Sequence, residues 1–350
     1  MASVTIYDVA ARAGVSIKTV SRVMNKEPNV RPAMRDRVLE AAGELGYSPN
    51  LSARSLAGSR SFVIAVFVDA ALTIDHWQSE RGADYLSRIQ LGATLRCREA
   101  GYHLLIELID NDGPNVRQDV AGFIAALKPD GVILTPPSSD NPGVLEALDK
   151  SGTPYVRVGP ERAEGLGPRV HMDDVAAARE MTEHLAALGH ERIGFIVGEP
   201  RYGASQARRQ GYLEAMRARG LSVAEGWVRQ GDFTFQSGLE QAKALLALPE
   251  RPTAIFASND DMALGCIAAI AEAGLMTPGD ISVAGFDDSP SSRFSRPQLT
   301  TVRQPVAEMS SVAAKLLIAQ AKSNDPPERP VDELMPFELI HRASTAPPPR

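Results

Sequence analysis

The sequence is poor in cysteine and lacks the long apolar runs of membrane proteins. Its 350 residues include only two cysteines, Cys97 and Cys266, which lie far apart within helix-like stretches. We expect both to be small buried residues in a reducing cytoplasm, rather than disulfide partners or metal ligands. No uncharged apolar run of about 18 residues occurs and no secretory signal is visible, so we expect a cytoplasmic protein without a membrane partner.

The sequence motifs of common enzymes are missing as well. The nearest match to a phosphate loop, GVSIKT from Gly14, has the wrong spacing, and HExxH, paired CxxC and GxSxG motifs do not occur. The six histidines have no metal-ligand spacing; they are His76, His103, His171, His184, His190 and His341. We therefore predict no catalytic residues, no metal and no cofactor, although acidic pairs later in the chain leave a cleft hydrolase open as an alternative.

Charge is distributed unevenly along the chain. The formal net charge is −6, which taken globally argues against a nucleic-acid partner. Residues 1–60, however, carry +4, and the remaining residues carry −10. A basic head on an acidic body is consistent with a head that binds phosphates and a body that binds something else.

Residues 5–25, TIYDVAARAGVSIKTVSRVMN, have the pattern of a helix-turn-helix. One helix begins near Ile6, a turn contains Gly14, and Ser16 is placed to cap a second helix. Ala10 precedes the turn glycine by four residues, where two helices touch and only a small side chain fits. Three apolar residues have the spacing to face the inside of the pair: Val15, Val20 and Val23.

The second helix presents polar and basic residues on its outer side. These are Ile17, Lys18, Ser21 and Arg22. This is the arrangement by which a recognition helix enters the major groove of DNA. An ordinary helical hairpin on an unrelated protein would show part of the same spacing.

A third helix and a linker follow. Arg31-Pro32 opens the helix and Gly46 ends it, because proline is favoured at the first helical position. Residues 47–61, rich in serine and alanine, have the composition of a flexible linker. After Asn50, the residues Leu51, Ala53, Leu56 and Ala57 would nevertheless line one side of a short helix. Since isolated helices this short are marginal in water, we expect this segment to become ordered on DNA.

From Phe62 onward, apolar strands alternate with amphipathic helices. Strands are expected at 62–68, 102–109, 131–135, 155–159, 192–198, 253–257 and 281–286. Helices are expected at runs that include 85–100, 173–188, 203–219, 234–248 and 260–273. Such a pattern predicts parallel sheets covered on both faces. Because the segment is too long for one sheet of five or six strands, we predict two doubly wound lobes with a seam near 159–168.

Polar and aromatic side chains follow several of these strands, where ligands of such sheets bind. They include Asp69, Tyr85, Arg208, Phe233, Asn259 and Asp287. Carboxylates, an amide and an arginine can hold hydroxyls, while the aromatic rings can stack on an apolar ring face. We expect Asp287 and Arg208 to contact a ligand from opposite sides of a cleft. Asp260 and Asp288 are expected to cap helices instead.

The chain resembles the LacI/GalR family of bacterial transcription regulators. Its head and hinge, TIYDVAARAGVSIKTVSRVMN and RVLEAAGELGYSPNLSARSLAG, resemble those of the family. HLAALGHERIGFIVG, IFASNDDMALG, DISVAGFDD and PQLTTVRQP resemble its effector-binding core. The similarity extends from Val4 to about Ser344 with the motifs in order. It implies a helix-turn-helix head, a hinge helix and a two-lobed core like that of periplasmic binding proteins.

The resemblance also implies how individual residues would contact DNA. Base-edge contacts in the major groove are implied for Ile17, Lys18 and Arg22. Ala53 and Leu56 match the hinge helix that enters the minor groove, where Leu56 would act as a wedge between base pairs. Phosphate contacts are implied for Tyr7, Ser16, Thr19, Ser21, Asn25 and Asn50. Family members bind as homodimers, so the operator is expected to be a pseudo-palindrome of double-stranded DNA.

For the core, the resemblance implies that the same six strand-end residues line an effector cleft. The expected domains are a head at 1–46, a hinge at 47–61 and a core at 62–345, followed by a disordered tail at 346–350. The chain is expected to cross back between the lobes near 288–300 and 322–332. No leucine heptad follows the core, so we expect a dimer rather than a tetramer, associated with the nucleoid.

Three positions depart from the family pattern. Arg31 and Met34 stand where small or hydroxylic residues are usual, and Gly159 stands where many relatives have an aspartate near the ligand. The predicted function is a repressor whose operator binding is relieved by a small sugar. A purine-like corepressor is the alternative, since Tyr85 and Phe233 would stack on a base. A sugar-binding protein without DNA function, or a cleft hydrolase, represents a different class.

Overall fold

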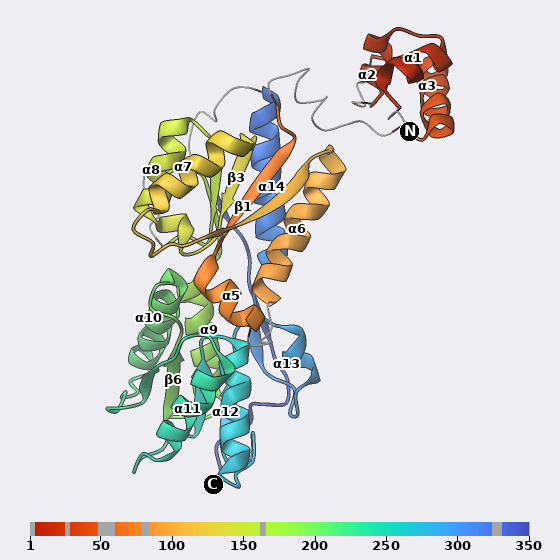
Figure 1. The fold of residues 1–350 in the computed structure, drawn as a ribbon. Coiled ribbons are helices and arrows are strands. Elements are labelled where there is room, and N and C mark those ends of the chain that lie inside the picture. The colour runs from red at the N-terminus through yellow and green to blue at the C-terminus, as the bar shows by residue number, and fades with distance from the viewer. Residues whose placement is uncertain are drawn as a thin grey trace.

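The computed structural model of the chain describes residues 4–24, 29–47, 60–78, 84–161, 166–323 and 331–349. They form a small helical head, which comes first in the chain, and two α/β lobes (Figure 1). Within these ranges, no helix combines the length and apolar character that crossing a bilayer requires. The predicted α/β class with a helical head is therefore confirmed.

The head consists of α1 (Ile6–Ala13), α2 (Ile17–Met24) and α3 (Pro32–Leu45). Its core is built from small and β-branched side chains that are almost fully buried: Val9, Ala10, Ala13, Val20, Val23, Val38, Ala41 and Ala42. Small residues allow the three short helices to approach closely. The apolar spacing that predicted the helix pair is thus the spacing of this core.

The turn between α1 and α2 depends on Gly14. This residue has φ 61°, a left-handed conformation that is strained for residues with a Cβ. Its carbonyl and that of Ala13 accept from the Arg37 guanidinium of α3, which fixes the turn against the third helix. Ser16 caps α2 as expected, because its hydroxyl accepts from the Thr19 N–H at 3.2 Å.

The first lobe is built on a six-stranded parallel sheet. Its order is β11 (Asp332–Leu334), β5 (Arg169–His171), β4 (Tyr155–Val158), β3 (Gly131–Leu134), β1 (Val63–Asp69) and β2 (His103–Ile109). Alternate residues of β1 face opposite sides, so Ile64, Val66 and Val68 pack with α6 (Asp84–Ala100) and α14 (Val306–Ser323). Ala65 and Phe67 face α7 (Val116–Leu127) and α8 (Pro142–Ser151) on the other side. The short helix α5 (Ala70–Gln78) continues from β1, and a 3-10 turn, η1 (Ser138–Asp140), precedes α8.

The second lobe repeats this architecture with fewer strands. Its parallel sheet has the order β7 (Val228–Gln230), β6 (Ile193–Val197), β8 (Ala254–Ala257) and β9 (Ser282–Ala284). One face packs on α9 (Asp174–Ala187) and α10 (Gly203–Ala218), and the other on α11 (Phe235–Leu246) and α12 (Asp260–Glu272). A short helix, α13 (Pro290–Phe294), and an antiparallel pair, β10 (Thr301–Arg303) with β12 (Glu338–Ile340), complete the lobe.

Each of the seven predicted strands and five predicted helices corresponds to an observed element, with ends that differ by at most two residues. Five three-residue strands, β5, β7, β10, β11 and β12, lie outside the predicted strand ranges. Strand β5 still pairs with β4 in the first sheet, so the chain enters the second lobe after His171 rather than at 159–168.

The two other crossings also lie later than expected. Strand β10 belongs with the second lobe, so the chain returns between Arg303 and Val306 rather than at 288–300. Strand β11 pairs with β5, which places the last crossing between Leu334 and Glu338 rather than at 322–332. In each case a short strand pairs within its lobe and so moves the crossing to a later residue. These strands bury little apolar surface, so backbone pairing is their main contact.

Near the end of the chain, Ala346 is hydrogen-bonded to the second lobe. Ala346 was expected to begin a disordered tail, but its N–H donates to the Ser282 hydroxyl at 3.0 Å. Its carbonyl oxygen lies 2.8 Å from His190 Nε2. Ala346 is therefore part of the ordered core rather than the start of a disordered tail, because buried polar groups of the lobe hold its backbone.

Close helix contacts in the lobes depend on glycine. A Cβ at Gly92 of α6 would lie 1.8 Å from the Ala307 carbonyl oxygen and 2.4 Å from the Ser310 hydroxyl of α14. A Cβ at Gly211 of α10 would lie 2.1 Å from the Val175 carbonyl oxygen of α9. Both contacts are backbone to backbone, so a side chain there forces the helices apart.

We predict that Gly92→Ala lowers the free energy of unfolding of the first lobe by about 1–3 kcal/mol, because α6 and α14 must separate. The matched control is Gly122→Ala on the exposed side of α7, where no atom of the described residues, apart from the helix's own backbone, lies within 4 Å of the added Cβ. Alanine there stabilises a helix by about 0.5–1 kcal/mol. Thermal unfolding of the two variants checks this, and equal melting temperatures would contradict it.

Candidate functional site

The outer side of α2 carries the residues predicted to contact base edges. Ile17 is 41% exposed, and Lys18 and Arg22 are exposed as well. Tyr7 on α1 is 67% exposed. The head therefore exposes an apolar residue and two cations on α2 and a tyrosine on α1.

Two of the predicted phosphate-contact residues, Ser16 and Thr19, lie at the start of α2. The Ser16 and Thr19 hydroxyls lie 2.9 Å apart, and the first of them also caps the helix. Both hydroxyls thus lie beside the N-terminus of α2, which attracts anions through its free N–H groups. Ser21 is partly exposed on the same helix. Four predicted contacts lie outside the described residues: Asn25, Asn50, Ala53 and Leu56.

A cavity of about 450 Å³ lies between the two lobes, at the carboxyl ends of their strands. All six predicted effector-contact residues line it: Asp69, Tyr85, Arg208, Phe233, Asn259 and Asp287. The first two come from the first lobe and the other four from the second. The volume is in the range of cavities that bind small molecules, about 300–1,000 Å³.

Arg208 on α10 is fixed in place by its surroundings. Its Nε donates to Asp174 at 2.8 Å, and Nη1 donates to the Ser258 carbonyl oxygen at 2.6 Å. Its guanidinium also stacks on the Phe286 ring at 3.7 Å from the centroid. A cation held on three sides presents its remaining donor edge with little loss of side-chain entropy.

Asp287 lies beside this arginine and is not an ordinary exposed carboxylate. Burial raises its pKa well above the usual value, and the nearby Asp260 carboxylate adds to the effect. The Gln304 amide donates to it, and its backbone has φ 125°, a strained value for an aspartate. Asp287 and Arg208 both belong to the second lobe, so they do not face each other across the cleft as we expected.

Asn259 connects a helix start to an aromatic ring. Its Oδ1 accepts from the Met262 N–H at 3.0 Å and so caps α12, while its Nδ2 donates to the Phe233 carbonyl oxygen at 2.9 Å. Phe233 itself has φ 68° and packs edge-on against Tyr202, with ring centroids 5.7 Å apart. The amide therefore holds an aromatic wall of the cavity in a strained conformation.

The expected capping roles of Asp260 and Asp288 are wrong. Asn259 caps α12, and Asp260 is fully buried, accepting from the Ser289 N–H at 2.7 Å and from the Thr301 hydroxyl at 2.6 Å. Asp260 thereby joins α12 to α13 and β10, next to Asn259 and Asp261, which line the cavity. Burial raises the pKa of this carboxyl.

Asp288 is a buried acceptor for arginines from three segments. Arg293 and Arg303 both donate to Oδ2 at 2.8 Å, and Arg342 donates to Oδ1. Burial opposes ionisation, but these hydrogen bonds outweigh it and lower the pKa to about 2. The charge cluster ties α13, β10 and the C-terminal segment together directly behind Asp287.

Sequence reasoning did not find several residues that line the same cavity. These are Asp174, Tyr202 and Gln304. Gly159, whose position was expected to be near the ligand, lines the cavity as well. Tyr202 follows strand β6 and could have been found by the rule that found the others. Asp174 and Gln304 could not, because they follow the short strands β5 and β10, which leave no apolar signal in the sequence.

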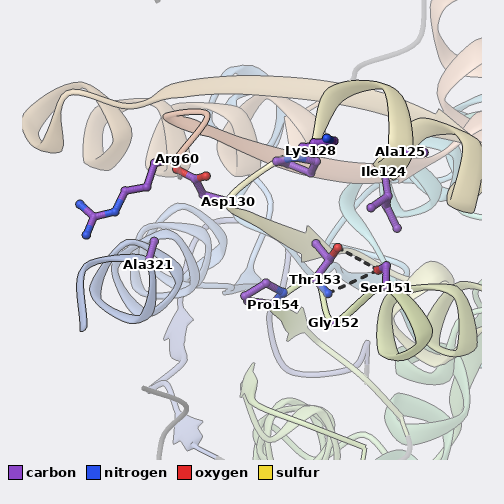
Figure 2. A pocket seen from close by; sticks show the side chains of 11 residues that line it. Arg60, Ile124, Ala125, Lys128, Asp130, Ser151, Gly152, Thr153, Pro154 and Ala321 are labelled. Atoms are coloured by element: carbon purple, nitrogen blue, oxygen red, sulfur yellow. Dashed lines mark hydrogen bonds between the residues drawn. The ribbon is translucent and has the colours of Figure 1, made fainter. Parts of the chain in front are cut away.

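A second cavity, of about 460 Å³, lies in the first lobe and contains none of the predicted site residues (Figure 2). Several of its polar groups already bond within the chain. The Ser151 and Thr153 hydroxyls lie 2.8 Å apart, and Asp130 accepts from the N–H groups of Ser61 at 2.8 Å and Phe62 at 2.9 Å. The interlobe cavity is therefore the stronger candidate for a ligand site.

Two family profiles match the chain in different regions. Residues 5–50 match the profile described as bacterial regulatory proteins, lacI family, and residues 182–345 match a periplasmic binding protein-like domain. Catabolite control protein A of Priestia megaterium is 35% identical over 321 residues, which is 90% of this chain and 92% of that protein. The chain belongs to the LacI family of bacterial regulatory proteins.

Solved structures of LacI-family proteins have the same fold. A transcriptional regulator CelR–cellobiose complex matches with a TM-score of 0.72 and 31% identity, over 97% of this chain and 99% of that chain. The lac repressor dimer bound to operator and the anti-inducer ONPF matches with a TM-score of 0.80 and 28% identity, over 99% of this chain and 100% of that chain. These relatives are regulators, and none of the three is named as an enzyme.

We predict that Asp288→Asn destabilises this LacI-family chain by about 2 kcal/mol at neutral pH, because three arginines lose their shared carboxylate. The folded pKa lies below the unfolded one, so this stabilisation is complete above pH 4 and disappears as the pH falls towards 2. Urea unfolding between pH 7 and pH 3 should show the difference from the parent protein shrinking below pH 4.

The control for this experiment is Asp119→Asn, an exposed residue of α7. It should leave the unfolding free energy unchanged within about 0.5 kcal/mol at every pH. A penalty for Asp288→Asn that stays constant from pH 7 to pH 3 would show that the cluster does not act through the ionised carboxylate.

Proposed function

We propose that this LacI-family chain is a sequence-specific DNA-binding regulator that acts as a homodimer and represses transcription. An uncharged sugar binding in the interlobe cavity relieves the repression. The observation that carries this proposal is the pairing of an exposed recognition face on α2 with a ligand-sized cavity lined by all six predicted contact residues. The operator-bound dimer and the cellobiose complex among the matched structures support it.

For the head, we propose that Ile17, Lys18 and Arg22 read base edges while Tyr7, Ser16, Thr19 and Ser21 position the helix on phosphates. The exposure of the first group and the placement of two hydroxyls at the start of α2 support these roles. We keep the proposed phosphate contacts of Asn25 and Asn50 and the minor-groove contacts of Ala53 and Leu56. The proposed domains remain a head at 1–46, a hinge at 47–61 and a core beyond.

The charge of the cavity favours an effector without negative charge. Among the described residues that line it, five are aspartates and one, Arg208, is a cation. The aspartates are Asp69, Asp84, Asp174, Asp261 and Asp287. In a partly buried site, those of the aspartates that are ionised would repel an added phosphate or carboxylate more strongly than in water. Hydroxyls, by contrast, can donate to carboxylates and accept from the arginine.

Apolar side chains occupy much of the remaining wall. Leu72 and Leu86 of the first lobe and Met172 of the second line the cavity, together with the rings of Tyr85 and Phe233. A sugar has apolar ring faces between its hydroxyls, so it matches both kinds of wall. A planar purine is the second candidate, because the two aromatic rings would also stack on a base.

We propose that the ligand holds the two lobes together and so changes the angle between the subunits of a dimer. The cavity residues come from both lobes, so a bound ligand interacts with both only in the closed arrangement. That differential interaction is what couples ligand binding to operator binding. The proposed sign is release of DNA when the sugar binds.

Arg22→Ala should weaken specific operator binding by about 1–3 kcal/mol, the contribution of one bidentate base contact. Fluorescence anisotropy against an operator selected from genomic fragments measures this. Arg217→Ala, which removes an exposed arginine from α10 in the second lobe, is the charge-matched control and should bind like the parent protein. Unchanged affinity of the Arg22 variant would show that α2 does not read the bases.

Cellobiose or glucose should bind at least tenfold more tightly than glucuronate or glucose 6-phosphate, because the lining carboxylates repel anions. Calorimetry on the full-length protein measures the difference, with a purine base in the same panel to test the second candidate.

Asp287→Ala should abolish the sugar response and leave operator binding intact.

The matched control is Asp110→Ala, which removes an exposed carboxylate that follows β2 and does not line the cavity. It should respond to the sugar like the parent protein. Preference for the anionic sugars would rule out the proposed effector class. A normal response of the Asp287 variant would place the effector site elsewhere.

A further inference from the structure

Two arginines cross the cleft in opposite directions, outside the set of residues that line the cavity. Arg201, in the loop between β6 and α10 of the second lobe, reaches the first lobe. Its Nη1 lies 2.9 Å from Asp112 Oδ2, and its Nη2 lies 3.5 Å from Asp69 Oδ2. Its Nε lies 3.2 Å from Glu199 of its own lobe. One guanidinium thus joins carboxylates of both lobes.

Arg88 on α6 makes the reverse contact. It donates from the first lobe to the main-chain oxygens of Asp287 at 2.9 Å and Asp288 at 2.5 Å. Its Nε pairs with Asp84, one turn earlier on the same helix, at 2.7 Å. Across the cleft, Arg88 therefore binds backbone carbonyl oxygens, whereas Arg201 forms ion pairs with carboxylates.

The partner of Arg201 matters because Asp69 is also a proposed ligand contact. This carboxylate is 3% exposed and is already held by the Asn111 amide at 3.1 Å and the Leu72 N–H at 3.1 Å. The Tyr202 hydroxyl, from the same loop as Arg201, lies 3.5 Å from it. Both contacts from the second lobe to Asp69 are long, while that to Asp112 is short. The shorter ion pair of Arg201 is therefore outside the cavity, and the longer one is to a residue that lines it.

We propose that Arg201 is a positioning residue that stabilises the closed arrangement of the lobes and thereby sets the affinity for the effector. This inference rests on the proposed function of the cavity. Arg201 does not line the cavity, so it acts by lowering the free energy of closure rather than by holding the ligand. An effector gains affinity because part of the closure is already stabilised before it arrives.

A salt dependence distinguishes this role from direct ligand contact. The Arg201 side chain is 31% exposed and that of Asp112 is 69% exposed, so ions in solution screen their attraction. Affinity for an uncharged sugar should consequently fall as ionic strength rises, although the ligand itself carries no charge. A residue that only shapes the loop would produce no such dependence.

The first experiment measures closure without any ligand. Spin labels on cysteines introduced at the exposed positions Gln118 of α7 and Arg217 of α10 report the distance between the lobes. The native cysteines are buried and should label slowly. Arg201→Ala should shift the population to longer distances at low salt, and the parent protein should move in the same direction at high salt.

Arg117→Ala is the matched control, because it removes an arginine that pairs with Glu146 within the first lobe only. It should keep the parent distances. Arg201→Lys should restore closure in part, since it keeps the charge but not the forked geometry. Parent-like distances and salt response in Arg201→Ala would overturn the proposal.

The second experiment measures the dissociation constant of cellobiose between about 50 and 500 mM salt. For the parent protein it should rise with salt, and for Arg201→Ala it should be roughly threefold to tenfold higher at low salt and nearly independent of salt. An unchanged constant would overturn the proposal. Altered lobe distances together with no binding of any sugar would instead contradict the effector class and leave the closure role standing.

Discussion

The structure depends on bringing the carboxyl ends of two parallel sheets face to face. Loops at those ends carry the polar residues of both lobes, so closing the lobes collects carboxylates in a partly buried space. Such charges are costly to bury unless each has a partner or takes up a proton. The chain uses both solutions: Asp288 stays ionised among three arginines, whereas burial raises the pKa of Asp260 and Asp287.

The same constraint connects the site to the rest of the molecule. Helix α6 carries Tyr85 on the cavity and Arg88 across the cleft, and it packs through Gly92 against α14, which begins just after the chain crosses between lobes. Exposed Leu91 and Leu95 lie further along α6. A change in lobe angle therefore moves a helix that touches the ligand space at one end and presents an apolar surface further along.

Much of this was predictable from the sequence, for a physical reason. A strand buried on both faces needs a continuous apolar run, as in FVIAVFV and RIGFIVG, and polar residues after several of these runs line the cavity. The head was predictable because Gly14 and the buried valines leave few alternatives. Short strands such as β5 and β10 are held by backbone pairing and carry no such run, so the crossings and Asp174 were misplaced or missed. The roles of Asp260 and Asp288 depend on partners from distant segments, which spacing cannot reveal.

The central claim is that effector and operator binding are coupled through lobe closure. Calorimetric titration of the effector into free protein and into the saturated operator complex tests this most directly. If the sugar relieves repression, its dissociation constant should be higher for the operator complex, and the sugar should weaken operator binding by the same factor, as thermodynamic linkage requires. Coupling of the usual size makes that factor about 5–150. Equal dissociation constants for free and operator-bound protein would contradict the account.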